Sequence, residues 1–156
     1  MSAAYRTVLC PTDLSAAGDA AVALAYRIVA DGGVVHLLHI AEPSFLVLPF
    51  DLAPVMVTPT SAETLAAYEK HATEHLNALA PQPSARGVRT ETHLVNDLGP
   101  SGVIQREAKN VRADAIVMGT HGRSGIRKLM MGSVAADVLN HAPIPVILLR
   151  QPHAKP

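Results

Sequence analysis

The sequence has little that could build a disulfide scaffold or an aromatic core. Cys10 is the only cysteine among 156 residues, so no disulfide can form within the chain, and a reducing, cytoplasmic setting is expected. Tryptophan is absent, and Phe and Tyr together make up only 3% of the chain. Because hydrophobic residues reach 49%, we expect a globular protein with an aliphatic core of Ala, Val, Leu and Ile.

An excess of charge of one sign and long hydrophobic runs are also lacking. The 13 Lys and Arg residues balance the 13 Asp and Glu residues, whereas a nucleic-acid-binding domain usually carries a basic surface. So few aromatic side chains also make a base-stacking platform unexpected. No hydrophobic run reaches the roughly 18 residues of a membrane span, and the first residues lack the pattern of a signal peptide. We therefore expect neither nucleic acid nor a membrane as a partner.

Short apolar segments alternate with segments of helical periodicity along the chain. The strand at 34–40, VVHLLHI, is apolar almost throughout, which is typical of a parallel strand covered on both faces, whereas the strand at 90–95 alternates and suits a sheet edge. Ser15 is predicted to be the N-cap of the first helix, and Gly32 its C-terminal stop. Strands are expected at 7–10, 34–40, 90–95, 115–118 and 145–149, and helices between Ser15 and Gly32 and at 61–79, 100–110 and 134–140.

This alternation predicts an α/β fold with an open parallel sheet wrapped by helices on both faces. We expect one domain over residues 1–150, followed by a disordered tail at 151–156. The Pro-rich connection at 41–59 is expected to be a packed loop, with a lid or a partner surface as the alternatives.

The segment 119–133, GTHGRSGIRKLMMGS, joins a buried strand to a helix. Glycines let main-chain N–H groups approach an anion, and a helix N-terminus favours negative charge. The segment therefore predicts a phosphate-binding loop, with Ser133 as helix cap and phosphate ligand, against the alternative of a flexible solvated loop. It is neither a Walker-type P-loop nor the dinucleotide fingerprint, because Gly-Lys-Ser/Thr and Gly-x-Gly-x-x-Gly are both absent.

A second candidate segment, Pro11-Thr12-Asp13, follows the first strand. If the first and fourth strands are neighbours, Asp13 lies across from Gly119 and can accept from ribose hydroxyls or help to hold a metal near the phosphates. Alternatively, Asp13 is there because the start of a helix favours an acidic residue. The two interpretations are compatible.

These motifs resemble the ATP-binding branch of the universal stress protein family, whose signature is Gly-x2-Gly-x9-Gly-Ser/Thr. The signature is filled by Gly119, Gly122, Gly132 and Ser133. Further similar segments are PTDLS at 11–15, HIAEP at 39–43, DAIVMGTHGRSG at 114–125 and PVILLR at 145–150.

The resemblance implies a Rossmann-like, five-stranded parallel sheet of order 3-2-1-4-5, with ATP between strands one and four. It also implies a Mg²⁺ or Mn²⁺ ion that bridges the phosphates. The implied nucleotide-binding residues are Pro11, Thr12 and Asp13 on the adenosine side, Ile40 at the adenine, Met118, Gly119, His121, Gly122 and Arg123 around the ribose and phosphates, and Gly132, Ser133 and Val134 at the phosphate tail.

Members of this family are commonly homodimers that pair through the last strand, and the sequence gives this expectation a physical reason. The segment PVILL at 145–149 would be an exposed apolar edge if it were unpaired, and such edges are normally paired or covered. Coverage by the chain's own loops or tail is the alternative.

The function expected is that of a nucleotide-dependent regulator in a stress response, with at most slow ATP hydrolysis. Hydrolysis requires a positioned water, and the sequence offers no residue that clearly positions one. The alternatives are a true ATPase or nucleotidyl-transfer enzyme on the same fold, and a dimeric interaction module whose pocket is empty. The choice between ATP and AMP stays open.

Several histidines and the cysteine invite other interpretations. His71, Glu74 and His75 match the H-x-x-E-H pattern of some zinc peptidases, but no third ligand is evident, so a surface helix face is preferred and no catalytic residue is assigned. His36 and His39 lie on a buried strand, where hydrogen-bonded core histidines are expected. Cys10 is expected to be a small buried hydrophobe, and His121 has either a structural or a phosphate-orienting role.

Overall fold

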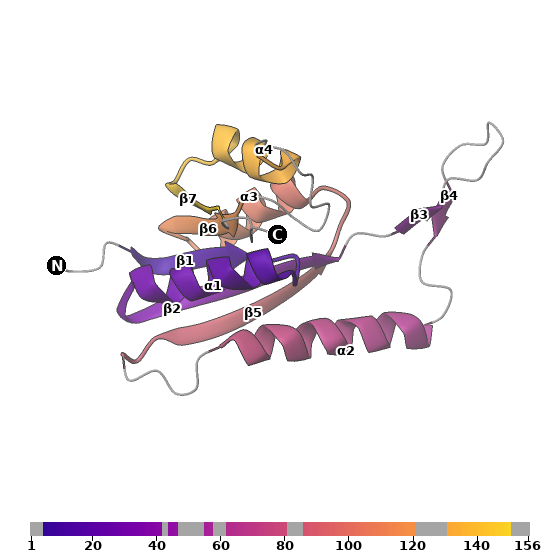
Figure 1. Cartoon of the computed structure of the whole chain (residues 1–156), viewed down its shortest axis with the longest axis horizontal. Helices are drawn as coiled ribbons and strands as arrows, with labels where there is room; N and C mark the ends of the chain where they lie inside the picture. Colours follow the sequence, from indigo (N-terminus) through magenta and orange to yellow (C-terminus); the bar gives the residue numbers. More distant parts are fainter. Residues whose placement is uncertain are drawn as a thin grey trace, which may run out of the picture.

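The computed structural model describes residues 5–41, 44–46, 55–57, 62–80, 86–120 and 131–150. Strands and helices alternate along the chain, and the whole is drawn in Figure 1. The strands are β1 (Tyr5–Pro11), β2 (Val29–Ala41), β3 (Ser44–Leu46), β4 (Val55–Val57), β5 (Arg89–Asn96), β6 (Ala115–Gly119) and β7 (Val146–Leu149). The helices are α1 (Ala16–Ile28), α2 (Ala62–Leu79), α3 (Pro100–Asn110) and α4 (Ser133–His141).

The main sheet has five parallel strands in the order β5-β2-β1-β6-β7. Counted along the chain within this sheet, that is the order 3-2-1-4-5, and it confirms the predicted fold class. β1 lies at the centre and β5 at one edge, as the alternating sequence of β5 predicts. β3 and β4 form a separate antiparallel pair within the 41–59 connection, where the sequence predicted only a loop.

Helices cover both faces of the sheet (Figure 1). On one face, α1 and α2 pack against the sheet through Val22, Ala25 and Leu76. On the other face, α3 and α4 pack through Ile104 and Val138. Successive residues of β1 point to opposite faces, so Val8 belongs to the first cluster and Leu9 to the second. Because both faces are covered, β1 and β2 are apolar along most of their length.

The first helix ends earlier than the sequence predicts. Gly32 was expected to stop it, but α1 ends at Ile28 and β2 begins at Val29, so Gly32 lies within a strand, with φ of +70°. The β1–β2 register jumps here: Tyr5 pairs with Val29 and Thr7 with Val34. Glycine is therefore used to form an irregularity in β2, not to end the helix.

A distant arginine contacts the main-chain carbonyls at the end of α1 instead. The Arg86 guanidinium donates to the carbonyls of Tyr26, at 2.8 Å, and of Val29, and it also pairs with Asp31. The main chain of Arg86 accepts from Gly32 N at 2.9 Å. The turn after α1 is thus fixed by a residue more than fifty positions away, which local sequence patterns cannot reveal.

None of the helices in the described part of the chain combines the length and apolar character needed to span a bilayer. Residues 151–156, predicted to be a disordered tail, lie outside the described residues.

We expect Arg86→Ala to lower the free energy of unfolding by about 1–3 kcal/mol, because several charge-assisted hydrogen bonds to main-chain carbonyls are lost together. Urea unfolding followed by circular dichroism measures the change. Arg106→Ala is the matched control: Arg106 pairs with Asp97 at 3.2 Å on the surface, and such pairs contribute about 0–1 kcal/mol. Equal effects of the two variants would contradict the role of Arg86.

Candidate functional site at the carboxyl edge of the sheet

The carboxyl ends of β1 and β6 lie side by side, because these strands pair in parallel, with Val8 opposite Ala115 and Leu9 opposite Ile116. β2 and β5 lie on one side of β1 in the sheet, and β6 and β7 lie on the other side. The strand order therefore reverses between β1 and β6. Open α/β sheets bind their ligands beyond the carboxyl ends of the strands at such a point.

The loop after β1 is tightly ordered by its own side chains. Thr12 is buried, its N–H donates to Leu38 O at 2.8 Å, and its Oγ1 accepts from Leu14 N at 3.1 Å. Asp13 Oδ1 accepts from the Ser15 main-chain N–H at 3.1 Å and from the Ser15 hydroxyl. Leu14 has a φ of +62°, a backbone conformation uncommon for leucine, so these hydrogen bonds hold the loop in a shape that the chain alone does not favour.

Ser15 is the N-cap of α1, as predicted, and its hydroxyl accepts from Gly18 N at 3.2 Å. The Asp13 carboxylate is therefore hydrogen-bonded to the residue that caps the helix. This geometry matches the interpretation that Asp13 suits a helix start. It also fixes the direction of the carboxylate, which a ribose-binding role would need as well.

A buried histidine supports the same loop from the neighbouring strand. His39 is only 3% exposed, and its Nδ1 lies 2.9 Å from the Thr12 carbonyl oxygen. Since a carbonyl only accepts, Nδ1 carries the proton, and in the neutral ring Nε2 accepts from the Tyr68 hydroxyl at 2.6 Å. Tyr68 on α2 and His39 on β2 thereby position the main chain of Thr12.

Gly18 lets the loop after β1 lie against α1. A Cβ on Gly18 would lie 2.3 Å from Thr12 Oγ1 and 2.9 Å from Asp13 Oδ1, and both distances are shorter than van der Waals contact. Neither Gly18 nor Tyr68 was predicted from the sequence to be a site residue. Gly18 had a local signal, a glycine inside an otherwise good helix pattern, whereas the position of Tyr68 on the apolar face of its helix did not indicate a contact with His39.

The second half of the candidate site lies after β6. Met118 is buried and Gly119 is half-buried at the strand end, where it pairs with Leu149. Beyond it, Thr120 N donates to Leu149 O at 3.1 Å, and Thr120 O accepts from Gly132 N at 2.8 Å. The two ends of the segment 119–133 are thus joined by a main-chain hydrogen bond directly before α4.

The N-terminus of α4 differs from the prediction in one residue. Gly132 is the N-cap and Ser133 is the first helical residue, so Ser133 does not cap the helix, and the N-cap glycine has no side chain to do so. Gly132 O accepts from Ala136 N at 2.9 Å, and the first turn contains no acidic residue. This leaves a helix N-terminus whose N–H groups and positive dipole suit an anion.

The structure places some of the predicted nucleotide-binding residues and not others. Ile40 is near the carboxyl end of β2, opposite Val95, and Val134 packs on the α3–α4 side of the core. Pro11 is buried at the end of β1. His121, Gly122 and Arg123, together with the basic residues Arg127 and Lys128, lie outside the described residues.

Cys10, His75 and His36 are held by packing or by contacts with neighbouring side chains. Cys10 is buried, and burial raises the pKa of its thiol, so it behaves as the small hydrophobe that was predicted. His75 Nε2 contacts Asp19 on α1 at 3.1 Å. His36 is buried, as predicted, and burial lowers the pKa of its imidazole, although the nearby Glu91 carboxylate opposes that shift.

Comparisons with known proteins agree with this fold. The model of the universal stress protein family matches residues 4–150. A universal stress protein of Methanocaldococcus jannaschii is 28% identical over 154 residues, which cover 95% of this chain and 84% of that protein. A universal stress protein solved in complex with cAMP shares the fold, with a TM-score of 0.60, 22% identity and coverage of 94% of this chain and 97% of that chain. One from Archaeoglobus fulgidus, solved in complex with dAMP, has a TM-score of 0.57, 23% identity and coverage of 94% and 98%.

We expect Gly18→Ala to destabilise the protein by about 1–3 kcal/mol, because the new methyl group overlaps Thr12 and Asp13. Gly102→Ala in α3 is the control, since nothing lies within 4 Å of the added Cβ. That control should gain about 0.5–1 kcal/mol from helix propensity. Urea unfolding of both variants measures the difference, and a gain of stability in both would show that the loop does not depend on close approach to α1.

Proposed function

The chain belongs to the universal stress protein family, and on this premise we propose that it binds an adenine nucleotide at the carboxyl edge between β1 and β6. The observation that supports the proposal is the main-chain hydrogen bond between Thr120 and Gly132 at the N-terminus of α4, where the N-cap is a glycine and the first turn has no acidic residue. This helix, α4, follows β6 in the chain. β6 is the neighbour of β1 in the sheet, and Thr12 and Asp13 follow the end of β1.

In the proposed complex, the phosphates bind to the main-chain N–H groups at the start of α4. An anion there gains both hydrogen bonds and the helix dipole. Ser133 is not used as the cap, so its hydroxyl can donate to a phosphate oxygen. Gly119, His121, Gly122 and Arg123 complete the phosphate side in this proposal, with Mg²⁺ or Mn²⁺ bridging the phosphates of ATP.

The adenosine side of the proposed site is the loop after β1. Asp13, held in direction by Ser15, accepts from a ribose hydroxyl, and the main chain near Ile40 contacts the adenine. The two structural neighbours solved with cAMP and dAMP support an adenine ligand. These ligands have in common the adenine and a phosphate on the sugar, so those two groups are the ones that a shared site would recognise.

We propose further that the bound nucleotide acts as a regulatory ligand in a stress response and is hydrolysed slowly at most. Rapid hydrolysis needs a residue that positions the attacking water. Asp13 Oδ1 is held by the Ser15 main-chain N–H and hydroxyl at the start of α1. That role suits an orienting contact better than the activation of a water molecule.

A homodimer that pairs through β7 is also part of the proposal. Ile116 N donates to Pro145 O, and Thr120 N donates to Leu149 O, so alternate residues of β7 face β6. Val146 and Leu148 therefore turn their main-chain groups away from the sheet. All four residues of β7 are half-buried by the core, and an edge with such apolar side chains favours pairing with a second copy.

We expect calorimetry to detect ATP binding to the purified chain and Gly132→Asp to weaken it at least tenfold, because a carboxylate at the N-cap of α4 repels the phosphates. Gly99→Asp is the matched control. Gly99 is the N-cap glycine of α3, has open space around it, and lies at the end of the edge strand β5. Aspartate is favourable at both caps, so both variants should fold.

Parallel titrations with AMP and cAMP identify the preferred adenine nucleotide, and mass spectrometry of the heated protein identifies what it carries as purified. Absence of bound nucleotide together with absence of calorimetric binding would overturn the proposal in favour of a nucleotide-free interaction module. Equal loss in the Gly99 and Gly132 variants would show that the α4 terminus is not the phosphate site.

For the dimer, light scattering coupled to size exclusion should give about twice the chain mass of 16.4 kDa. Leu148→Pro removes an N–H that points away from β6 and should shift the particle toward a monomer. A wild-type monomer at micromolar concentration, or a variant that stays dimeric, would contradict pairing through β7.

A further inference from the structure

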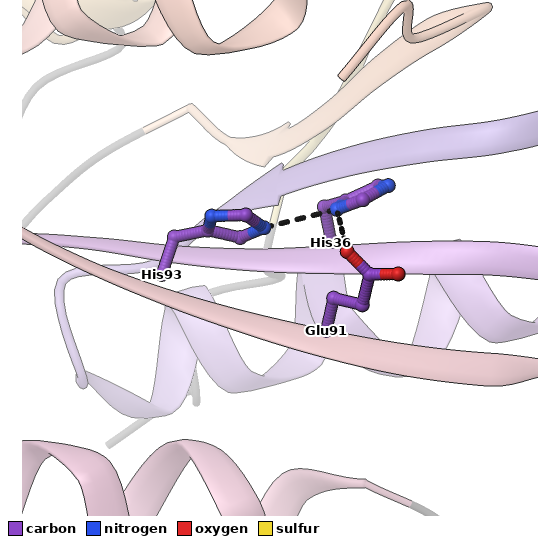
Figure 2. Close-up of side chains that lie close together, drawn as sticks. All are labelled: His36, Glu91 and His93. Carbon is purple, nitrogen blue, oxygen red and sulfur yellow. Dashed lines mark hydrogen bonds and ion pairs between the residues drawn. The ribbon is translucent and has the colours of Figure 1, made fainter. Parts of the chain in front are cut away.

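Two histidines and a glutamate meet on one face of the sheet, at the pair of strands farthest from β7. His36 is on β2, and Glu91 and His93 are on the edge strand β5 (Figure 2). Glu91 is directly opposite His36 in the register, and His93 is opposite Leu38, two pairs further along. Residues two apart on a strand point to the same face, so Glu91 and His93 both reach the His36 ring.

We propose that His36, Glu91 and His93 form a binding site for a divalent transition-metal ion, and that zinc fits it best. Two imidazoles and one carboxylate are the donor set found in zinc sites with three protein ligands and an open fourth position. Within the part of the chain that the structure describes, this is the group of side chains whose potential ligand atoms converge, all within 4.8 Å of one another.

Two of the three distances between the ligand atoms are close to those around a tetrahedral ion. Ligands that each lie about 2.0–2.1 Å from zinc at a tetrahedral angle are about 3.3 Å apart. His36 Nδ1 lies 3.0 Å from His93 Nε2 and 3.5 Å from Glu91 Oε2. These two separations bracket the tetrahedral value, and the potential ligand atoms of Glu91 and His93 lie within 4.8 Å of each other, so binding an ion requires rotation of these two partly exposed side chains.

The burial of the three residues gives the site an inner wall and an opening. The His36 side chain is 8% exposed and the Glu91 side chain 54% exposed, while His93 is half-buried. The buried ring is fixed by packing, and the carboxylate is free to turn toward an incoming hydrated ion. A water molecule can fill the fourth position from the solvent side, as in zinc sites that keep one position open.

The alternative is that the three side chains simply hydrogen-bond to one another. In that state a proton lies between His36 Nδ1 and His93 Nε2. Metal binding needs both imidazoles to be neutral, with their protons on the nitrogens that face away from the ion. Arg89 lies on the same face two residues before Glu91, and its charge disfavours a cation. Binding and hydrogen bonding are therefore in competition, and titration with the metal decides between them.

In the described part of the chain, the H-x-x-E-H segment on α2 does not belong to a group of three converging ligand atoms. His75 is held by Asp19, and the rings of His71 and His75 are 6.5 Å apart. The proposed site instead combines residues from two strands that are more than fifty positions apart. Because its ligands lie on β2 and β5, an ion here would cross-link the edge strand β5 to the rest of the sheet. This site is separate from the proposed phosphate site, which lies at the end of β6.

The test is a calorimetric titration of the full chain with zinc chloride after removal of metals by a chelator. We expect about one zinc ion per chain, and at least a tenfold loss of affinity in Glu91→Gln and in His93→Gln, since each removes one ligand. Both side chains are partly exposed, so both variants should fold. His71→Gln combined with His75→Gln is the control and should leave the affinity unchanged.

Two further readouts make the result specific. Zinc should raise the melting temperature of the wild-type chain but not that of the His93→Gln variant, because a ligand stabilises only the state that binds it. An excess of Mg²⁺ should not displace the zinc, because Mg²⁺ prefers oxygen ligands. The proposal is overturned if zinc does not bind, if binding follows His71 and His75, or if both single variants bind as tightly as the wild type.

Discussion

The central position of β1 is the constraint on which the rest of the structure depends. β1 is paired on both sides and covered on both faces, so its residues Val8, Leu9 and Cys10 are fully buried. A strand in that position forces β2 and β6 to build away from it in opposite directions. The carboxyl ends of β1 and β6 therefore lie side by side, and the candidate nucleotide site follows from this topology and not from any single residue.

The described parts of the candidate site are held mainly by hydrogen bonds of the main chain. After β1, the main chain of Thr12 is fixed by Leu38 and His39, and its side chain by contact with Leu14. After β6, the hydrogen bond between Thr120 and Gly132 brings the segment back to the start of α4. Most of these contacts are made by main-chain atoms. Such a design tolerates variation in side chains, which fits a family whose members here share only about a quarter of their residues with this chain.

The two proposed ligand sites use different physical means. The phosphate site relies on main-chain N–H groups and a helix dipole, which recognise charge and shape. The metal site relies on imidazole nitrogens held in register by neighbouring strands, which recognise a borderline-soft cation. His36 and His39 lie three residues apart on β2 and therefore point to opposite faces. His39 supports the loop after β1, and His36 belongs to the proposed metal site.

The sequence by itself determined the fold class, the strand order through its family resemblance, the bounds of most elements and the position of the glycine signature. These depend on local periodicity and on a motif contiguous in the chain. Only the tertiary structure decided that Arg86 binds the carbonyls at the end of α1. The same holds for the close approach of Thr12 to Gly18 and for the contact of His36 with Glu91 and His93. The reason is physical: each of these contacts joins side chains brought together by strand register or helix packing, and spacing along the chain does not encode such a meeting.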